Sequence, residues 1–305
     1  MPERTLRIFV AGEHGQVARA LGRACPPRGH TVRLAGRATA DLANGVALSG
    51  AMAAFWPDLV VNAAAYTAVD RAEDEPEKAF RLNRDGAANV AAAAAALHAP
   101  LIHLSTDYVY DGAKSSAYLE TDAPRPLGVY GASKLAGEAA ITEIAGDQVI
   151  LRTSWVCSPD GNNFVKTMIR LAGQCDEIGV VDDQWGAPTF AADLAEAIIS
   201  IGEILLSLND RSGVTGLYHI SGTGETTWCR FARAIMKGSS DKGGPSCRVR
   251  AITTQEYQTR AKRPANSRLD CSKLARVFGL SMPPWQTSLN SCLDQLLAVS
   301  QRVST

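Results

Sequence analysis

Short apolar runs alternate with longer helical patterns along the first half of the chain. The apolar runs predict strands and the patterns between them predict helices: strands at 6–11, 31–34, 58–64, 101–105 and 148–155, and helices at 16–24, 46–55, 77–97 and 130–144. The stretch 91–96 is all alanine, a strong helix former. Repeated strand–helix units of this length predict a parallel sheet that is covered by helices on both faces.

The pattern becomes less regular after Trp155, where polar turn residues interrupt it. A helix predicted near 193–208 returns to the first lobe, and an amphipathic helix is predicted at 288–299. We therefore predict an α/β protein with a Rossmann-like doubly wound parallel sheet and a smaller mixed α/β C-terminal domain. The first domain comprises 1–155 with a returning segment near 186–212, and the second comprises 156–185 and 213–305.

The charge balance and the hydropathy exclude several classes of protein. The 305 residues carry 31 basic and 31 acidic side chains, so the formal net charge is zero, which argues against a nucleic-acid partner. The apolar runs are too short or too interrupted to span a bilayer, and the first residues lack the pattern of a signal peptide. We expect a soluble cytoplasmic protein with no membrane partner.

The cysteines and histidines do not form a recognisable site. The seven cysteines include no Cys-x-x-Cys pair and are odd in number, and the five histidines share no ligand spacing. Neither a zinc site nor a disulfide framework fits this distribution. We expect reduced, partly buried thiols and predict no metal site.

A glycine turn follows the first predicted strand. It has the form Gly-x-x-Gly-x-x-Ala, in which Gly12 and Gly15 precede a helix that begins with Gln16 and Val17. Glycine lets the backbone turn tightly and approach a pyrophosphate, and the helix offers unpaired amides to its negative charge. Ala18 replaces the third glycine at a position that mainly serves close helix packing. In this context the turn predicts a bound dinucleotide.

The end of the second predicted strand bears on the choice of dinucleotide. An acidic residue at this place would bind a 2′-hydroxyl and select NAD, whereas this chain has Gly36 and Arg37. The Arg37 guanidinium can pair with a 2′-phosphate, so NADPH is favoured and NADH stays possible. Asp41 and Leu42 lie where a loop can cover the adenine. Alternatively, Arg37 is a surface arginine that contacts nothing.

Small and polar residues end the third and fourth predicted strands. Those after the third strand leave room for the ribose and nicotinamide: Ala64, Ala65, Tyr66 and Thr67. Core packing explains the same alanines nearly as well. Thr106 ends the fourth strand and is placed to hydrogen-bond a substrate carbonyl, with capping of the strand end as the alternative.

Tyr130 and Lys134 lie four residues apart in the sequence YGASK. Residues i and i+4 share a face of a helix, so the ammonium can lower the pKa of a phenol, which is ~10 when free. Such a tyrosine can exchange a proton with a carbonyl oxygen at neutral pH, which is reductase chemistry. The pair alone is common by chance. Together with Thr106 and the glycine turn, it indicates a dinucleotide-dependent oxidoreductase.

In this order the motifs resemble the extended short-chain dehydrogenase/reductase superfamily, which acts largely on nucleotide sugars. Eight strings resemble the dTDP-4-dehydrorhamnose reductase family across nearly the whole chain: NAAAYTAVDRAE, LSTDYVYDG, PLGVYGASKLAGE, ILRTSWV, GNNFVKTM, DDQWGAPT, GLYHISGTGETTW and RPANSRLD. The resemblance implies reduction of the C4 ketone of dTDP-4-dehydro-L-rhamnose by NAD(P)H to dTDP-L-rhamnose. This is the last step of dTDP-rhamnose biosynthesis, which serves cell-surface polysaccharides. The first domain would bind the dinucleotide and the second the substrate.

The resemblance also implies roles for single residues. Tyr130 would protonate the carbonyl oxygen, Lys134 would hold the nicotinamide ribose and lower the tyrosine pKa, and Thr106 would tune the proton transfer. Trp155 matches a position that packs on the sugar, although the residue alone favours a core tryptophan. The remaining matches near the substrate are Val69, Asp107, Tyr108, Asn163 and Arg263, of which the arginine suits a diphosphate but equally an internal salt bridge.

Three points stay open. Magnesium is associated with some members of the family, but Ala191 and Ala192 stand where a bridging carboxylate would be sought, so the metal is left unassigned. A monomer and a homodimer both fit the resemblance. The alternative functions are a non-catalytic NADP-binding regulatory subunit and another nucleotide-sugar epimerase or dehydratase. Retention of the threonine, tyrosine and lysine favours an enzyme, and the single carboxylate after Thr106 favours reduction, because dehydratases usually have an acidic pair there.

Overall fold

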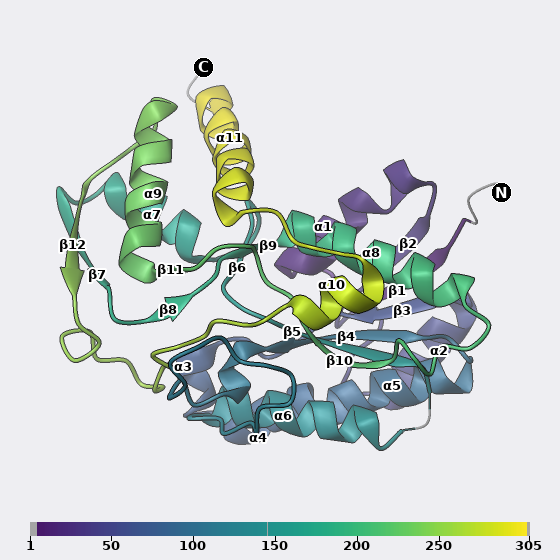
Figure 1. The fold of residues 1–305 in the computed structure, drawn as a ribbon. Coiled ribbons are helices and arrows are strands. Elements are labelled where there is room, and N and C mark those ends of the chain that lie inside the picture. The colour runs from purple at the N-terminus through teal and green to yellow at the C-terminus, as the bar shows by residue number, and fades with distance from the viewer. Residues whose placement is uncertain (1–4, 145, 304–305) are drawn as a thin grey trace.

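A six-stranded parallel sheet forms the centre of the structure, a computed structural model that describes residues 5–144 and 146–303 (Figure 1). Its strands are β1 (Arg7–Ala11), β2 (Thr31–Ala35), β3 (Leu59–Asn62), β4 (Leu101–Thr106), β5 (Gln148–Thr153) and β10 (Gly216–His219). The order is β10-β5-β4-β3-β1-β2, and every neighbouring pair is parallel. The predicted α/β fold with a doubly wound sheet is confirmed.

Helices cover both faces of this sheet (Figure 1). The helices on one face are α1 (Gln16–Ala24) and α8 (Ala191–Ser207), and those on the other are α2 (Gly45–Phe55), α5 (Gly86–Ala96) and α6 (Val129–Thr142). Leu21 and Ile198 pack in the core of the first face, and Met52 and Ile141 pack in that of the second. Helix α8 packs beside α1, so the chain runs along the central sheet again in this segment. Within the described ranges, no helix combines the length and apolar character that a membrane crossing requires.

The strand order creates a binding crevice at the carboxyl ends of the strands. Strand β1 lies between β2 and β3. The chain adds β2 on one side of β1 and then β3, β4 and β5 on the other, so the strand order reverses at β1. The register aligns Ala11, the last residue of β1, with Ala35 on β2 and Asn62 on β3. In doubly wound sheets, ligands bind outside the carboxyl ends of the strands at such a reversal.

A smaller lobe of helices and short strands packs beside the sheet (Figure 1). It contains α7 (Phe164–Ala172), α9 (Trp228–Asp241), α11 (Trp285–Val303) and the strand pairs β7 (Glu177–Val181) with β12 (Arg248–Ile252), β6 (Val156–Cys157) with β9 (Thr189–Phe190), and β8 (Trp185–Gly186) with β11 (Thr226–Thr227). Met168, Phe231, Ile235 and Leu293 pack in a separate hydrophobic core. This arrangement agrees with a second, mixed α/β unit.

One segment of the predicted second domain lies in the central sheet instead. The boundary predicted at 213 assigns β10 to the second domain, but β10 pairs with β5. Helix α10 (Ser272–Phe278) also packs against the central sheet rather than in the smaller lobe, because Leu274 and Phe278 lie in the core formed by α1 and α8. Strand β10 has only four residues, which is too short for a periodic signal in the sequence. The rest of the predicted domain division stays a prediction.

The long helix predicted at 77–97 is interrupted. After α3 (Val69–Ala72), the chain forms α4 (Pro76–Phe80), a π-helical turn at Arg81–Asp85, and then α5. In this turn the Asn83 side chain donates to Ser133 Oγ (2.9 Å) and to the Tyr66 carbonyl (3.1 Å), and it accepts from the Tyr66 amide (2.7 Å). The Asn83 carbonyl oxygen lies so close to Gly137 of α6 that a Cβ there would overlap it. These long-range contacts, which helix propensity does not reveal, account for the π turn.

Replacing Gly137 with alanine should destabilise the fold, because the new Cβ overlaps the Asn83 carbonyl oxygen. Overpacking of this kind costs about 1–3 kcal/mol of unfolding free energy. The matched control is Gly50→Ala, since Gly50 is exposed on α2 and a Cβ there meets nothing within 4 Å. The control should gain about 0.5–1 kcal/mol. Urea unfolding measures both, and a Gly137→Ala protein as stable as the wild type would contradict the close contact.

Candidate active site

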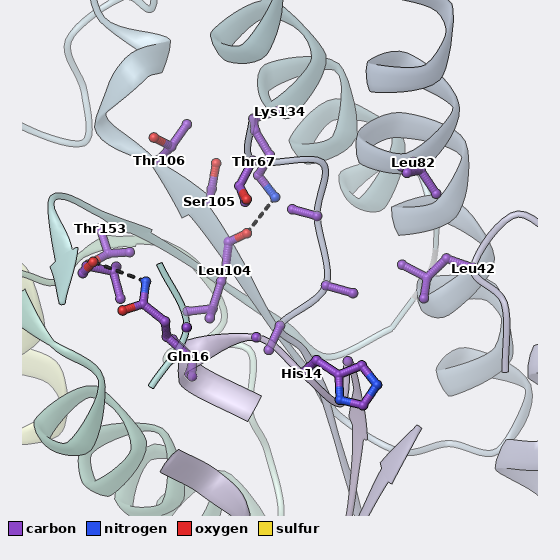
Figure 2. A pocket seen from close by; sticks show the side chains of 18 of the residues that line it. His14, Gln16, Leu42, Thr67, Leu82, Leu104, Ser105, Thr106, Lys134 and Thr153 are labelled. Atoms are coloured by element: carbon purple, nitrogen blue, oxygen red, sulfur yellow. Dashed lines mark hydrogen bonds between the residues drawn. The ribbon is translucent and has the colours of Figure 1, made fainter. Parts of the chain in front are cut away.

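A cleft of about 770 Å³ opens at the carboxyl ends of the central strands (Figure 2). It brings together most of the predicted site residues: Gly12, Gly15, Gln16, Val17, Arg37, Asp41, Leu42, Ala64, Ala65, Thr67, Val69, Thr106, Asp107, Tyr108, Tyr130, Lys134 and Trp155. These residues come from loops that follow several strands, from the first turn of α1 and from the first two turns of α6. The sheet topology therefore assembles one site from distant parts of the sequence.

The glycine turn closes one end of the cleft. Gly12 has a φ of 126°, which favours glycine, and a Cβ there would lie 3.4 Å from backbone atoms of Ala63 and Ala64. The turn is thus pressed against the end of β3. Gly15 caps α1 without a side-chain hydrogen bond, so the cap itself leaves the amides of the first turn to another acceptor. This geometry suits a pyrophosphate.

The loop after β2 forms the adjoining wall. Arg37 is exposed and lines the cleft together with Asp41 and Leu42. Within residues 5–144 and 146–303, no carboxylate forms an ion pair with the Arg37 guanidinium. The guanidinium is therefore available to an anionic group of a ligand.

Thr106, Tyr130 and Lys134 converge deeper in the cleft. Thr106 ends β4, and the other two lie one turn apart on α6. The Tyr130 hydroxyl forms a hydrogen bond with Thr106, and its ring meets that of Tyr108 edge-on, with centroids 5.6 Å apart. Thr106 Oγ1 also donates to Asp107 Oδ1 (3.0 Å). A chain of hydrogen bonds therefore runs from the phenol through the threonine to a carboxyl group.

The Lys134 side chain points toward β4 (Figure 2). Its Nζ donates to the Leu104 carbonyl (2.7 Å) and lies 3.2 Å from His103 Nε2. Burial lowers the pKa of Lys134 to about 8, although the nearby Glu138 carboxylate acts in the opposite direction. Lys134 therefore carries its charge at neutral pH and loses it as the pH rises through about 8.

The prediction that Lys134 lowers the pKa of Tyr130 is wrong for this structure. Burial raises the pKa of Tyr130 to about 12, while the hydrogen bond with Thr106 opposes the increase and the Asp107 carboxylate adds to it. The i, i+4 spacing does put both residues on one face of α6, but the acceptors on β4 draw the ammonium away from the phenol. Tyr130 therefore holds its proton at neutral pH.

Asp107 is a buried acid beside this group, in the short turn Asp107–Val109 after β4. Burial raises the pKa of Asp107 to about 6, against hydrogen bonds with Ser267 and Thr106. Among the described residues, its Oδ2 atom has no hydrogen-bond partner. Asp107 can thus exchange protons near neutral pH, and it has an oxygen available for a ligand.

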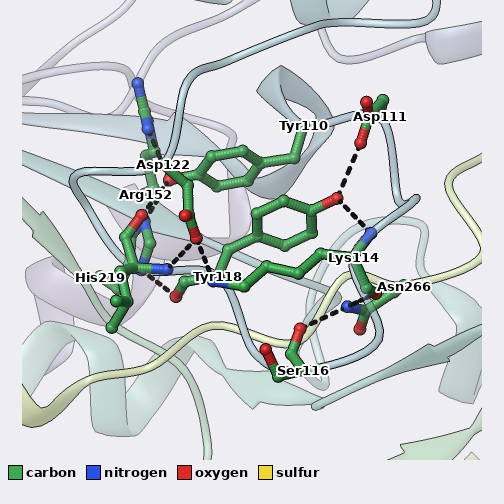
Figure 3. Close-up of polar contacts among 10 residues, drawn as sticks. Tyr110, Asp111, Lys114, Ser116, Tyr118, Asp122, Arg152, His219 and Asn266 are labelled. Atoms are coloured by element: carbon green, nitrogen blue, oxygen red, sulfur yellow. Dashed lines mark hydrogen bonds and ion pairs between the residues drawn. The ribbon is translucent and has the colours of Figure 1, made fainter.

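A buried polar network lies behind the part of α6 that carries Tyr130 and Lys134. Arg152 of β5 donates to both carboxylate oxygens of Glu138 (2.9 and 2.5 Å) and to the Tyr110 hydroxyl (2.7 Å). That hydroxyl also lies 2.7 Å from His219 Nε2, and Figure 3 shows Arg152, Tyr110 and His219 grouped together. Because Glu138 follows Lys134 by one helical turn, this network ties α6 to the central sheet.

Three predicted residues lie outside the cleft lining. The Tyr66 side chain donates to Glu75 (2.8 Å) and packs in a small cluster with Ala72 and Ala79. Asn163 caps α7 and donates to Gln16 Oε1 (2.9 Å), so it lies behind a lining residue. Arg263 forms the internal salt bridge that was the alternative to a diphosphate contact, with Asp70 at 2.8 Å. Each of these side chains is held by a partner that the linear sequence does not identify.

Trp155 lines the cleft in an unusual conformation. Its φ of 47° lies in the left-handed region, which is strained for a tryptophan. The indole stacks on Trp228 of α9 with a centroid separation of 3.5 Å, and a Cβ at Gly186 would overlap it. Trp155 is buried and also lines the cleft, and its contact with the sugar stays a prediction.

The sequence analysis missed several lining residues, among them Leu82, Leu104, Thr153 and Asn162. Thr153 ends β5 as Thr106 ends β4, so its position at a strand end was a usable signal. Its Oγ1 is buried and lacks a hydrogen-bond partner within the described part of the chain. Leu82 lies in the π turn, which gave no signal in the sequence.

The structure does not offer a ready metal site. In residues 5–144 and 146–303, no group of three or more His, Cys, Asp or Glu side chains is arranged to hold a metal ion. All seven cysteines are free thiols. Asp193, which follows Ala191 and Ala192, is partly buried, and burial raises its pKa.

Comparison with known proteins identifies the family. Residues 6–298 match the family model described as the RmlD substrate binding domain. The dTDP-4-dehydrorhamnose reductase of Sinorhizobium fredii is 45% identical over 292 residues, which cover 96% of this chain and 98% of that protein. The chain belongs to this reductase family. The protein of the same name from Escherichia coli is 40% identical over 300 residues, covering 97% and 99% of the two chains.

Solved structures of dTDP-4-dehydrorhamnose reductases share the fold along almost the whole chain. The Bacillus anthracis protein, solved in complex with NADP, has a TM-score of 0.87 at 34% identity and covers 96% of this chain and 100% of its own. The Clostridium acetobutylicum protein has a TM-score of 0.88 at 33% identity, with coverage of 95% and 99%. The UDP-glucose 4-epimerase of Brucella ovis, with a TM-score of 0.76 at 18% identity, covers 94% and 96% and shows the shared fold alone.

Proposed function

We propose that this protein reduces the C4 ketone of dTDP-4-dehydro-L-rhamnose with NADPH to give dTDP-L-rhamnose. The observation that carries the proposal is the convergence of Thr106, Tyr130 and Lys134 in a cleft whose far end is a glycine turn. Family membership supports the choice of substrate, since relatives named for this reduction match over nearly their full lengths. We also propose that the protein acts in the cytoplasm, as a monomer or a homodimer.

The residues of the cleft fit a dinucleotide. Gly12 has a positive φ that favours glycine in the turn, and the first-turn amides of α1 would hold the pyrophosphate. Arg37 would pair with a 2′-phosphate, and the Lys134 ammonium would donate to the nicotinamide ribose. When bound, NADPH supplies the hydride for the ketone carbon.

Tyr130 would donate its phenolic proton to the ketone oxygen. Its raised pKa keeps the hydroxyl protonated before the reaction. The hydrogen bond from Tyr130 to Thr106 and on to Asp107 provides a route by which the phenol regains a proton afterwards. The hydrogen bond with Thr106, which acts to lower the pKa of Tyr130, would stabilise the phenolate that forms.

The sugar would lie against the remaining part of the lining. Val69, Asp107, Tyr108 and Trp155 all face the cleft and are proposed to contact the substrate. The Asp107 oxygen without a partner is suited to accept a hydrogen bond from a sugar hydroxyl. Arg263 is not proposed to hold the diphosphate, because its guanidinium is bound to Asp70.

A substrate panel tests the proposal directly. Purified protein is incubated with NADPH and several 4-keto-6-deoxy sugar nucleotides, and the loss of NADPH absorbance and the product stereochemistry are followed. We expect the dTDP-linked L-sugar to be reduced fastest, with dTDP-L-rhamnose as the product. Binding of NADPH without turnover of any sugar would instead favour a regulatory subunit. Epimerisation or dehydration without net NADPH consumption would favour an epimerase or a dehydratase.

Tyr130→Phe should abolish most of the activity while leaving NADPH binding nearly intact. Loss of the general acid removes about 3–6 kcal/mol of transition-state stabilisation, seen as a lower kcat. Tyr218→Phe is the matched control, because that hydroxyl donates to the Val214 carbonyl (2.8 Å) in the first lobe and Tyr218 is not among the residues that line the cleft. A drop in kcat of less than about tenfold for Tyr130→Phe would show that another group is the acid.

Arg37→Ala should weaken the preference for NADPH over NADH. Loss of a charge-assisted contact with a 2′-phosphate raises KM for NADPH by about tenfold or more and leaves KM for NADH nearly unchanged. Arg33→Ala serves as the control, since Arg33 is exposed on β2 but does not line the cleft. Steady-state kinetics with both cofactors decide, and an unchanged ratio would remove the assignment.

A further inference from the structure

We propose that His103 is the positioning residue for Lys134: its neutral imidazole accepts a hydrogen bond from the ammonium and, with the Leu104 carbonyl, directs the remaining N–H into the cleft. This inference rests on the proposed function, because the group that receives this N–H is a ribose hydroxyl of the dinucleotide. His103 itself does not line the cleft and acts only through Lys134.

The position of His103 in β4 explains how it reaches the lysine. Side chains alternate along a strand, so Leu101, His103 and Ser105 share the face that α6 covers. Leu101 packs in the same core as Ile141 of α6. His103 follows Leu101 on this face and is only 1% exposed. Its imidazole therefore occupies a core position that an apolar side chain would normally fill.

The contact with Lys134 fixes the tautomer of this imidazole. Burial and the neighbouring ammonium hold the pKa of His103 well below its usual value, so the ring is neutral. An ammonium can only donate, so Nε2 at 3.2 Å must be the bare acceptor and the proton must lie on Nδ1. Within the described residues Nδ1 is buried and has no partner. Burying an unpaired N–H costs free energy, so packing alone does not explain a histidine at this position. The role of acceptor for Lys134 does explain it, because Nε2 can accept only when the proton is on Nδ1.

The two acceptors on β4 leave one donor of the ammonium free for a ligand. Lys134 has three N–H groups, of which one is directed to the Leu104 carbonyl and one to His103. Lys134 lines the cleft, so the third can reach a bound molecule there. Two fixed acceptors restrict the rotation of the ammonium, and a preorganised donor loses less entropy on binding.

The other ionisable groups near Lys134 are neutral or bound to other partners, so the histidine is the side chain that accepts its hydrogen bond. Glu138 lies one turn later on α6, but Arg152 of β5 already binds both of its carboxylate oxygens. Tyr130 lies one turn earlier and is neutral, and Asp107 is engaged with Thr106. His103 is thus the uncharged side-chain acceptor that meets the ammonium directly.

The test compares His103→Leu with His103→Gln. Leucine fills the core but removes the acceptor, whereas the glutamine amide oxygen can take the place of Nε2. We expect His103→Leu to weaken NADPH binding by about tenfold, because the Lys134 ammonium loses part of its preorganisation toward the cleft. It should also move the alkaline limb of the kcat and NADPH-binding profiles to lower pH by about one unit, because Lys134 loses an interaction that favours its charged form. His103→Gln should restore both.

Several results would overturn the inference. A His103→Leu protein with wild-type NADPH affinity and an unmoved alkaline limb refutes it, and so does a protein that is only less stable to heat. In the wild type, long-range ¹⁵N–¹H spectra should show His103 neutral with a bare Nε2, so a protonated Nε2 also refutes it, whether or not the variants fold. Wild-type protein that binds NADPH but reduces no sugar contradicts the proposed function alone, since the binding profiles still test His103. Wild-type protein that does not bind NADPH contradicts both.

Discussion

The close approach of α6 to its neighbours is the constraint on which the site depends. A Cβ at Gly131 would overlap the Tyr108 carbonyl, and one at Gly137 would overlap that of Asn83. Because the helix backbone lies this close, Tyr130 reaches Thr106 at the end of β4, and Lys134 reaches the carbonyl of Leu104. The π turn at Arg81–Asp85 and the Arg152–Glu138 pair then hold the helix from two sides. The contacts that pack α6 against its neighbours therefore also set the positions of Tyr130 and Lys134 in the cleft.

Local patterns were sufficient to predict most of the fold. The helix at 16–24 has the predicted bounds because an amphipathic pattern begins directly after the glycine turn. The segment at 77–97 was misread because its interruption arises from contacts of Asn83 with α6 and Tyr66, which are distant in sequence. Strand β10 was misplaced because four residues carry too little periodicity to be assigned to a sheet. Local propensity identified these elements, but tertiary contacts decided their limits.

The site shows the same division between what is local and what is not. The positions of Gly12, Arg37 and Thr106 at strand ends predicted their place in the cleft, since parallel strands end at one side of the sheet. Side-chain partners were not predictable in this way, as the Asp70 salt bridge of Arg263 illustrates. The pKa of Tyr130 depends on burial and on where Lys134 points, and both follow from the three-dimensional packing. Spacing in the sequence therefore located the chemical groups without giving their electrostatics.

The stack of Trp155 on Trp228 provides the molecule with an internal optical reporter. Trp155 follows β5 of the central sheet and Trp228 begins α9 of the smaller lobe, so the two rings join the parts that enclose the cleft. Parallel indoles at 3.5 Å couple electronically, and their near-ultraviolet circular dichroism depends on the angle and separation of the rings. Any shift of the smaller lobe against the sheet would therefore change this signal without an added label.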